Sequence, residues 1–179
     1  ETFAELFGAT AKFADREFLV YEQERVTFGG FRRATIALAN RLVEEGITKG
    51  DRVAIIMRNL PEWFVAFYGA ALAGAVVTPL NGWWTGPELE FGLSDSGARL
   101  AIVDDRQLTS IAPHLDACPM LERVFVSRHE GPLPSDPRLA RLEDLIGTPN
   151  QWAELPKGSL PAIAFAPDDD VAILYTSGT

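Results

Sequence analysis

The last nine residues of the chain combine two features of a phosphate-binding loop. Residues 171–175 (VAILY) form a short apolar run with β-branched side chains, which predicts a buried strand. The residues that follow are Thr176, Ser177, Gly178 and Thr179. Glycine lets the backbone approach an anion closely, and N–H and hydroxyl groups can donate hydrogen bonds to phosphate oxygens. We predict that these four residues bind phosphate; the alternative is an ordinary turn after a strand.

Other candidate motifs in the sequence are weaker evidence for a functional site than residues 176–179. The chain has no G-x-x-x-x-G-K-[ST], and Gly29-Gly30 lacks the third glycine of a dinucleotide-binding loop. His114 and His129 lack the spacing of a metal site or a hydrolase triad, so we expect both at the surface. The acidic triplet 168–170 could hold Mg²⁺, but a solvated loop is the preferred interpretation. We therefore predict no metal ligands in this chain.

The elements that must position the loop alternate between strand-like and helix-like segments. This alternation predicts an α/β fold with a largely parallel sheet and flanking helices. The expected strands are 52–57, 75–80 and 100–103, after a hairpin over 18–28; the expected helices are 27–45, 59–73 and 85–96. Repeated βα units thus cover residues 51–115. Residues 127–170 are rich in proline and predict a long irregular excursion, with one short helix over 139–146.

Composition limits the classes of partner and compartment. The net charge is −9 and no basic run occurs, which argues against nucleic acid as a partner. A single cysteine, Cys118, excludes an internal disulfide and favours a reducing compartment, so we expect a structural thiol and a cytoplasmic protein. Nothing near Glu1 is typical of a signal peptide. Residues 63–87 carry no charge, but glycines and a proline interrupt them, which predicts a buried helix and strand, not a transmembrane segment.

Several segments together resemble one known family. They are GDRVAIIMRN at 50–59, PEWF at 61–64, ALAGAVVTPLN at 71–81, LSDSGARLAIVDD at 93–105 and DDDVAILYTSGT at 168–179. In order and spacing they resemble the adenylate-forming enzymes, which include acyl-CoA synthetases, luciferases and peptide-synthetase adenylation domains. YTSGT resembles the first half of that family's signature Y-T-S-G-T-T-G-x-P-K-G. The pair Trp83-Trp84 departs from the family pattern, and we expect both rings to be half-buried, with an exposed contact surface as the alternative.

The resemblance implies a function for a longer parent protein. Residues 1–179 would be an incomplete N-terminal portion of the large ATP- and acyl-binding domain of an acid–CoA ligase, with 171–179 as strand and start of the phosphate loop. Thr176, Ser177, Gly178 and Thr179 would bind the β- and γ-phosphates of ATP. The implied partners are ATP, Mg²⁺, coenzyme A and a carboxylic acid, first a fatty acid and second an aryl or alicyclic acid.

The family's catalytic residues would all lie beyond Thr179, so we expect no catalytic residue here and no ligase activity from this chain alone. Two alternatives remain open: a non-catalytic interaction module that keeps the scaffold, or another nucleotide-binding α/β domain such as an oxidoreductase.

Overall fold

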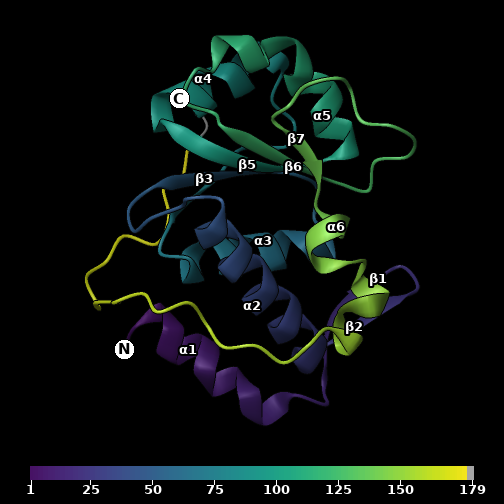
Figure 1. Ribbon diagram of the computed structural model, residues 1–179, viewed down its shortest axis with the longest axis vertical. Helices are drawn as coiled ribbons and strands as arrows, with labels where there is room; N and C mark the ends of the chain where they lie inside the picture. The colour runs from purple at the N-terminus through teal and green to yellow at the C-terminus, as the bar shows by residue number, and fades with distance from the viewer. Residues whose placement is uncertain (177–179) are drawn as a thin grey trace.

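A parallel sheet dominates the computed structural model, which describes residues 1–176. Within this part of the chain the sheet has five strands: β3 (Arg52–Ile56), β4 (Val76–Pro79), β5 (Ala98–Asp104), β6 (Arg123–Ser127) and β7 (Leu139–Arg141). Their order in space is β4-β3-β5-β6-β7, and each neighbouring pair is parallel. Of these strands, Figure 1 labels β3, β5, β6 and β7. Because the winding direction reverses after β4, where the chain crosses β3 to reach β5, the connecting helices cover both faces of the sheet. The predicted α/β class with a largely parallel sheet is confirmed.

Helices lie on both sides of this sheet (Figure 1). One face carries α2 (Phe28–Glu44) and α3 (Pro61–Leu72), and the other carries α4 (Gly86–Ser96) and α5 (Asp105–Ile111). The remaining elements are α1 (Phe3–Ala9), η1 (Thr10–Phe13), the hairpin β1 (Glu17–Tyr21) with β2 (Glu24–Thr27), η2 (Ala112–Ala117), α6 (Glu143–Ile146) and η3 (Pro149–Glu154). Helix α1 packs outside α2 and α3 through aromatic contacts.

Alternation along each strand divides the interior into two cores. In β3, Val53 and Ile55 face the core under α2 and α3, whereas Ala54 and Ile56 face the core under α4 and α5. β5 alternates in the same way. A strand that is buried on both faces must be apolar at every position, which explains why the strands appear in the sequence as continuous apolar runs.

Capping residues fix the ends of the helices where the sequence predicts them. The Thr27 hydroxyl accepts a hydrogen bond from the Gly30 amide at 3.1 Å, at the start of α2. At the start of α4 the Thr85 amide donates to the Glu88 carboxylate at 2.7 Å, as a capping box requires. Gly97 ends α4 with a φ of 62°, a left-handed conformation that glycine adopts without steric cost.

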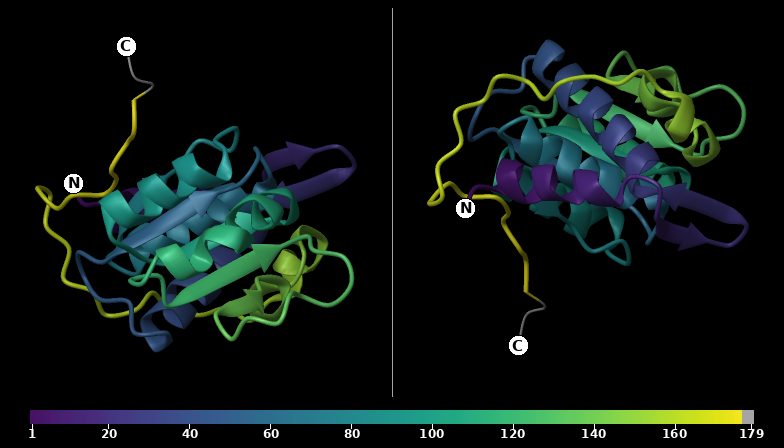
Figure 2. Two further views of the ribbon diagram at one scale, coloured as in Figure 1. Left: turned by 90° about the horizontal axis from the view of Figure 1, so that it is seen from above. Right: turned by 90° about the horizontal axis from the view of Figure 1, so that it is seen from below.

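The stretch 127–170 is more regular than we expected at its start. Strand β7 occupies Leu139–Arg141, where the sequence pattern predicted the first half of a helix, and only Glu143–Ile146 is helical. The helix prediction fails there because residues 139–141 pair with β6, a strand that the sequence reading did not predict. Residues 155–170 contain no helix or strand and run along the outside of the helical layer (Figure 2). Side chains hold this segment in place: Asn40 Nδ2 donates to the Ser159 carbonyl at 2.9 Å, and Lys49 Nζ to the Ala164 carbonyl at 2.7 Å.

Candidate functional site

The segment that leads into the predicted phosphate loop lies beside β4. Ala172 forms one parallel bridge with Val77, in which the Val77 amide donates to the Val171 carbonyl and the Ile173 amide donates to the Val77 carbonyl, both at 2.9 Å. The predicted buried strand over 171–175 is therefore only partly right. Ile173 is 39% exposed and Leu174 is 73% exposed, because no strand among residues 1–176 pairs with the outer edge of this segment.

Of the four predicted phosphate-binding residues, the structure places Thr176. Ser177, Gly178 and Thr179 lie outside the described residues. Thr176 is exposed and follows the bridge in the direction of the parallel strands, so it lies toward their carboxyl ends. That edge of an open parallel sheet is where ligands bind in this class of fold.

Tyr175 holds the chain against α4 immediately before Thr176. Its hydroxyl donates to Asp95 Oδ2 at 2.7 Å, and its ring meets Trp84 edge to face with the centroids 5.7 Å apart. Burial and the hydrogen bond to Asp95 raise the pKa of Tyr175 to about 12. The hydroxyl therefore stays protonated at neutral pH and remains a donor.

A buried carboxylate occupies the carboxyl end of β5. Asp104 accepts hydrogen bonds from the Arg58 amide at 3.1 Å, from Arg58 Nε at 2.7 Å and from the Gln107 amide at 3.0 Å. The bond to Asp104 raises the pKa of Arg58 above its ordinary value. Asp104 thus caps α5 and fixes the turn after β3, and all of its contacts are structural.

A second charged cluster follows β6, and the sequence reading missed it. Arg128 donates from Nε to Glu62 Oε1 at 2.8 Å and from Nη2 to Glu24 Oε2 at 2.7 Å, while its amide donates to Glu143 Oε1 at 2.6 Å. Glu62 is 2% exposed. The burial of Glu62 could not be predicted from the residues around it, because its partner Arg128 comes from a distant segment of the chain.

The histidines each meet one acid. His114 Nδ1 lies 2.6 Å from Glu90 Oε2, and His129 Nδ1 contacts Asp105. Both side chains are half-buried, so the prediction of surface residues holds only in part. His129 Nε2 also contacts the Pro132 carbonyl, and within residues 1–176 no hydroxyl or thiol joins either pair to complete a triad.

Residues 1–176 bring no three His, Cys, Asp or Glu side chains together in a group that could hold a metal ion. Within the acidic triplet, Asp169 pairs with Lys49 Nζ at 2.6 Å. The Mg²⁺ that the resemblance implies therefore has no ligand set within residues 1–176.

The adjacent tryptophans differ in their surroundings. Trp84 is half-buried, as predicted, whereas Trp83 is 79% exposed. The prediction for Trp83 is wrong because its ring turns outward, where the Arg106 guanidinium lies 4.9 Å from the ring centroid.

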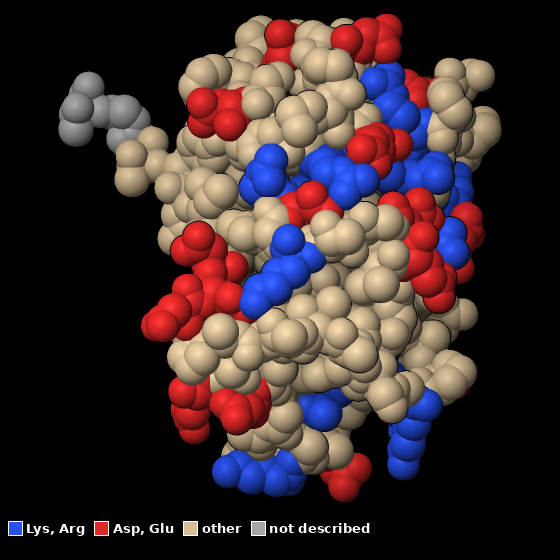
Figure 3. Space-filling model, turned by 60° about the vertical axis from the view of Figure 1, so that its left-hand side comes forward, with Lys and Arg blue, Asp and Glu red and all other residues tan. Residues whose placement is uncertain are grey.

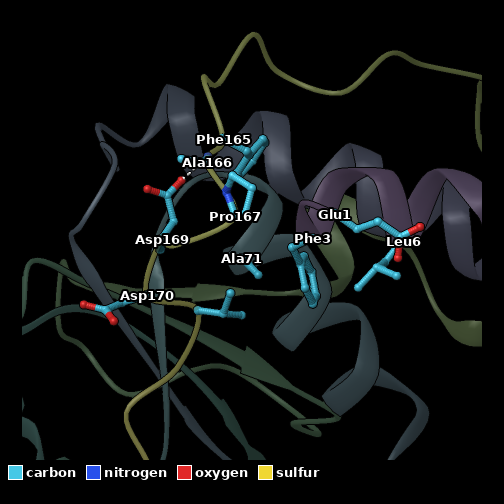
Figure 4. Close-up of a pocket in the computed structure, with 11 residues that line it drawn as sticks. Glu1, Phe3, Leu6, Ala71, Phe165, Ala166, Pro167, Asp169 and Asp170 are labelled. Carbon is cyan, nitrogen blue, oxygen red and sulfur yellow. Dashed lines mark hydrogen bonds between the residues drawn. The ribbon is translucent and has the colours of Figure 1, made fainter.

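A shallow hollow lies elsewhere, between α1, α3 and residues 165–171 (Figure 4). Phe3, Ala71 and Pro167 contribute apolar surface to it, and Asp169 and Asp170 lie on one side. Thr176 does not line this hollow, so it is separate from the predicted loop.

On the face shown in Figure 3, carboxylates lie among the Lys and Arg side chains.

The comparisons with known proteins agree with one another. The family profile described as AMP-binding enzyme matches residues 6–179. A long-chain-fatty-acid–CoA ligase, FadD13, of Mycobacterium tuberculosis (strain CDC 1551 / Oshkosh) is 38% identical over 149 residues, which cover 80% of this chain and 26% of that protein. A 4-coumarate–CoA ligase 2 of Oryza sativa subsp. japonica is 34% identical over 161 residues, 83% of this chain and 25% of that protein.

A crystal structure of the anthranilate CoA ligase AuaEII with anthranoyl-AMP superposes with a TM-score of 0.84 at 24% identity, over 99% of this chain and 32% of that one. This structural likeness supports the fold. The chain spans about a quarter of the length of these two curated relatives. Each helix within residues 1–176 falls short of the length or the hydropathy that a membrane-spanning helix needs.

Proposed function

Because this chain belongs to the family of AMP-binding enzymes, we propose that it forms the N-terminal part of an AMP-forming acid–CoA ligase. The observation that carries the proposal is the family match through residue 179, together with the position of Thr176 toward the carboxyl ends of the parallel strands. A loop there can surround the phosphates of ATP with backbone and hydroxyl donors.

The proposed reaction has two steps. The substrate carboxylate attacks the α-phosphorus of ATP, pyrophosphate leaves and an acyl-adenylate forms. The thiol of coenzyme A then attacks the acyl carbonyl and AMP leaves. Thr176, Ser177, Gly178 and Thr179 would hold the β- and γ-phosphates, where negative charge increases as pyrophosphate departs.

We propose a fatty acid as the first substrate class. The name of the FadD13 relative supports this choice, and the name of the 4-coumarate ligase supports an aryl acid as the second candidate. The single free and buried cysteine, Cys118, suits the cytoplasm as the proposed location.

Acid-dependent exchange of pyrophosphate into ATP tests the proposal in a polypeptide that carries this chain together with the rest of the enzyme. We expect exchange with long-chain fatty acids and weaker exchange with cinnamic-type acids. Thr176→Ala should lower kcat/KM for ATP by about a hundredfold, since one preorganised donor to a developing charge is worth about 3 kcal/mol. Absence of exchange with every acid would contradict the proposal and favour the non-catalytic interaction module.

The 179-residue chain by itself should form no acyl-CoA. The resemblance implies that the family's catalytic residues follow this portion of the enzyme. Within residues 1–176, two charged pairs after the strands, Arg58 with Asp104 and His129 with Asp105, are already joined to each other. Mass spectrometry of a reaction with ATP, coenzyme A and a fatty acid should detect no thioester, and detection of one would contradict this assignment.

A further inference from the structure

Tyr175 is the last residue before Thr176, and backbone pairing does not reach it. The bridge between Ala172 and Val77 has its last hydrogen bond at the Ile173 amide. Leu174, between that amide and Tyr175, is largely exposed. The side chain of Tyr175 is therefore the contact that places the backbone just before Thr176.

The Tyr175 side chain packs against one side of α4 and against Trp84, which precedes that helix. The hydroxyl lies 2.7 Å from Asp95 Oδ2 and 3.5 Å from the Gly92 carbonyl, and the ring packs on Trp84. Trp84 in turn requires a small residue beneath it, because a β-carbon at Gly92 would lie 2.9 Å from Trp84 Cζ3. A single turn of α4, from Gly92 to Asp95, thus contacts both aromatic rings.

We infer that Tyr175, Asp95 and Trp84 form a latch that fixes where the chain leaves the sheet edge at Thr176, and that they are positioning residues for ATP. The inference rests on the proposed function for its ligand and on the contacts above for its geometry. The three residues act through the backbone at Thr176, and none of them is assigned a contact with the reacting atoms.

Energetic coupling between the hydroxyl and the carboxylate distinguishes a latch from two unrelated contacts. Tyr175→Phe removes the donor and keeps the ring, and Asp95→Ala removes the acceptor at an exposed position of α4. In the complete enzyme each change should raise KM for ATP about fivefold, the effect expected from one hydrogen bond. The double variant should be no worse than either single variant, because both remove the same bond.

KM for the carboxylic acid should stay within about twofold of the parent in all three variants. General destabilisation would not raise KM for ATP while it leaves KM for the acid unchanged. Tyr68→Phe is the matched control, because the Tyr68 hydroxyl makes no hydrogen bond within residues 1–176 and its ring lies in the other core. An unchanged KM for ATP in Tyr175→Phe, or equal rises for ATP and acid, would overturn the assignment.

A titration separates failure of the latch from failure of the proposed function. In the complete polypeptide labelled with ¹³Cζ-tyrosine, the Tyr175 signal is identified by its loss in Tyr175→Phe. It should titrate near its raised pKa of about 12 and move toward 10 in Asp95→Ala. A Tyr175 signal that already titrates at its ordinary value of about 10 would show that the latch is absent. An enzyme with no pyrophosphate exchange but with the raised titration would keep the latch and reject ATP as its ligand.

Discussion

At the scale of single residues, Arg128 connects three elements that lie far apart in the sequence, and no sequence pattern predicted these contacts. Its guanidinium meets Glu62 from α3 and Glu24 from β2, and its backbone amide meets Glu143 at the start of α6. Its φ of 59° is in the left-handed region, which a non-glycine residue adopts at some cost. Several contacts to different elements offset this cost.

Replacement of Arg128 should destabilise the fold strongly. Arg128→Met keeps the β-carbon and much of the volume but leaves the buried Glu62 carboxylate without its partner. Breaking a buried ion pair in this way costs about 3 kcal/mol at neutral pH, measurable by urea denaturation. Arg25→Met is the control, since Arg25 is exposed and, within residues 1–176, its side chain donates to the carbonyls of Glu22 and Glu24 alone. An equal loss in both variants would contradict this role for Arg128.

The deficit of Arg128→Met should shrink as the pH falls. Burial raises the pKa of Glu62 above its ordinary value, while Arg128 opposes that rise. Without Arg128 the pKa rises further, so the folded variant binds a proton more tightly than the unfolded chain does. Lower pH then favours its folded state. Urea midpoints measured at about pH 7 and about pH 5 should converge toward those of the parent, and a deficit that grows on acidification would refute this account.

At the scale of elements, local signals predicted the segment from the β1–β2 hairpin through β5 well, but they missed α1 and η1 before it and the strands β6 and β7 after it. Thr27 and Thr85 cap their helices through residues three positions away, so their sequence context was sufficient to predict the starts of α2 and α4. β7 consists of residues 139–141, and its pairing with β6 is decided by contacts with another strand. The exposure of Ile173 and Leu174 depends in the same way on which strand lies beside them.

A glycine-to-alanine substitution at the end of α4 should destabilise the fold, whereas the same substitution in α1 should stabilise it. Gly97→Ala forces an alanine to a φ of 62° and places its β-carbon 2.7 Å from Arg52 Nη2, so we expect a loss of at least about 1 kcal/mol. Gly8→Ala in α1 meets nothing within 4 Å and should stabilise by about 0.5 to 1 kcal/mol through helix propensity. Thermal unfolding of both variants provides the measurement, and a shift of Tm in the same direction for both would contradict the assignment.

At the scale of the whole molecule, the two cores share the same strands. β3 and β5 give alternate side chains to each core. A change in one core therefore disturbs a sheet on which the other core depends, and small domains of this kind usually unfold in one cooperative step. Two tryptophans report on the two sides: Trp152 is buried in the core under α2 and α3, and Trp84 packs on the core under α4 and α5.

Leu89→Ala tests this cooperativity from one side only. Leu89 lies on the buried face of α4, and its truncation should cost about 3 kcal/mol. Single-tryptophan backgrounds that retain either Trp84 or Trp152 should show the same fall in urea midpoint, each relative to its own background. Val20→Ala, at an exposed position of β1, should leave both midpoints nearly unchanged. If the Trp84 signal shifts while the Trp152 signal does not, the two faces unfold separately, and the shared strands do not couple them.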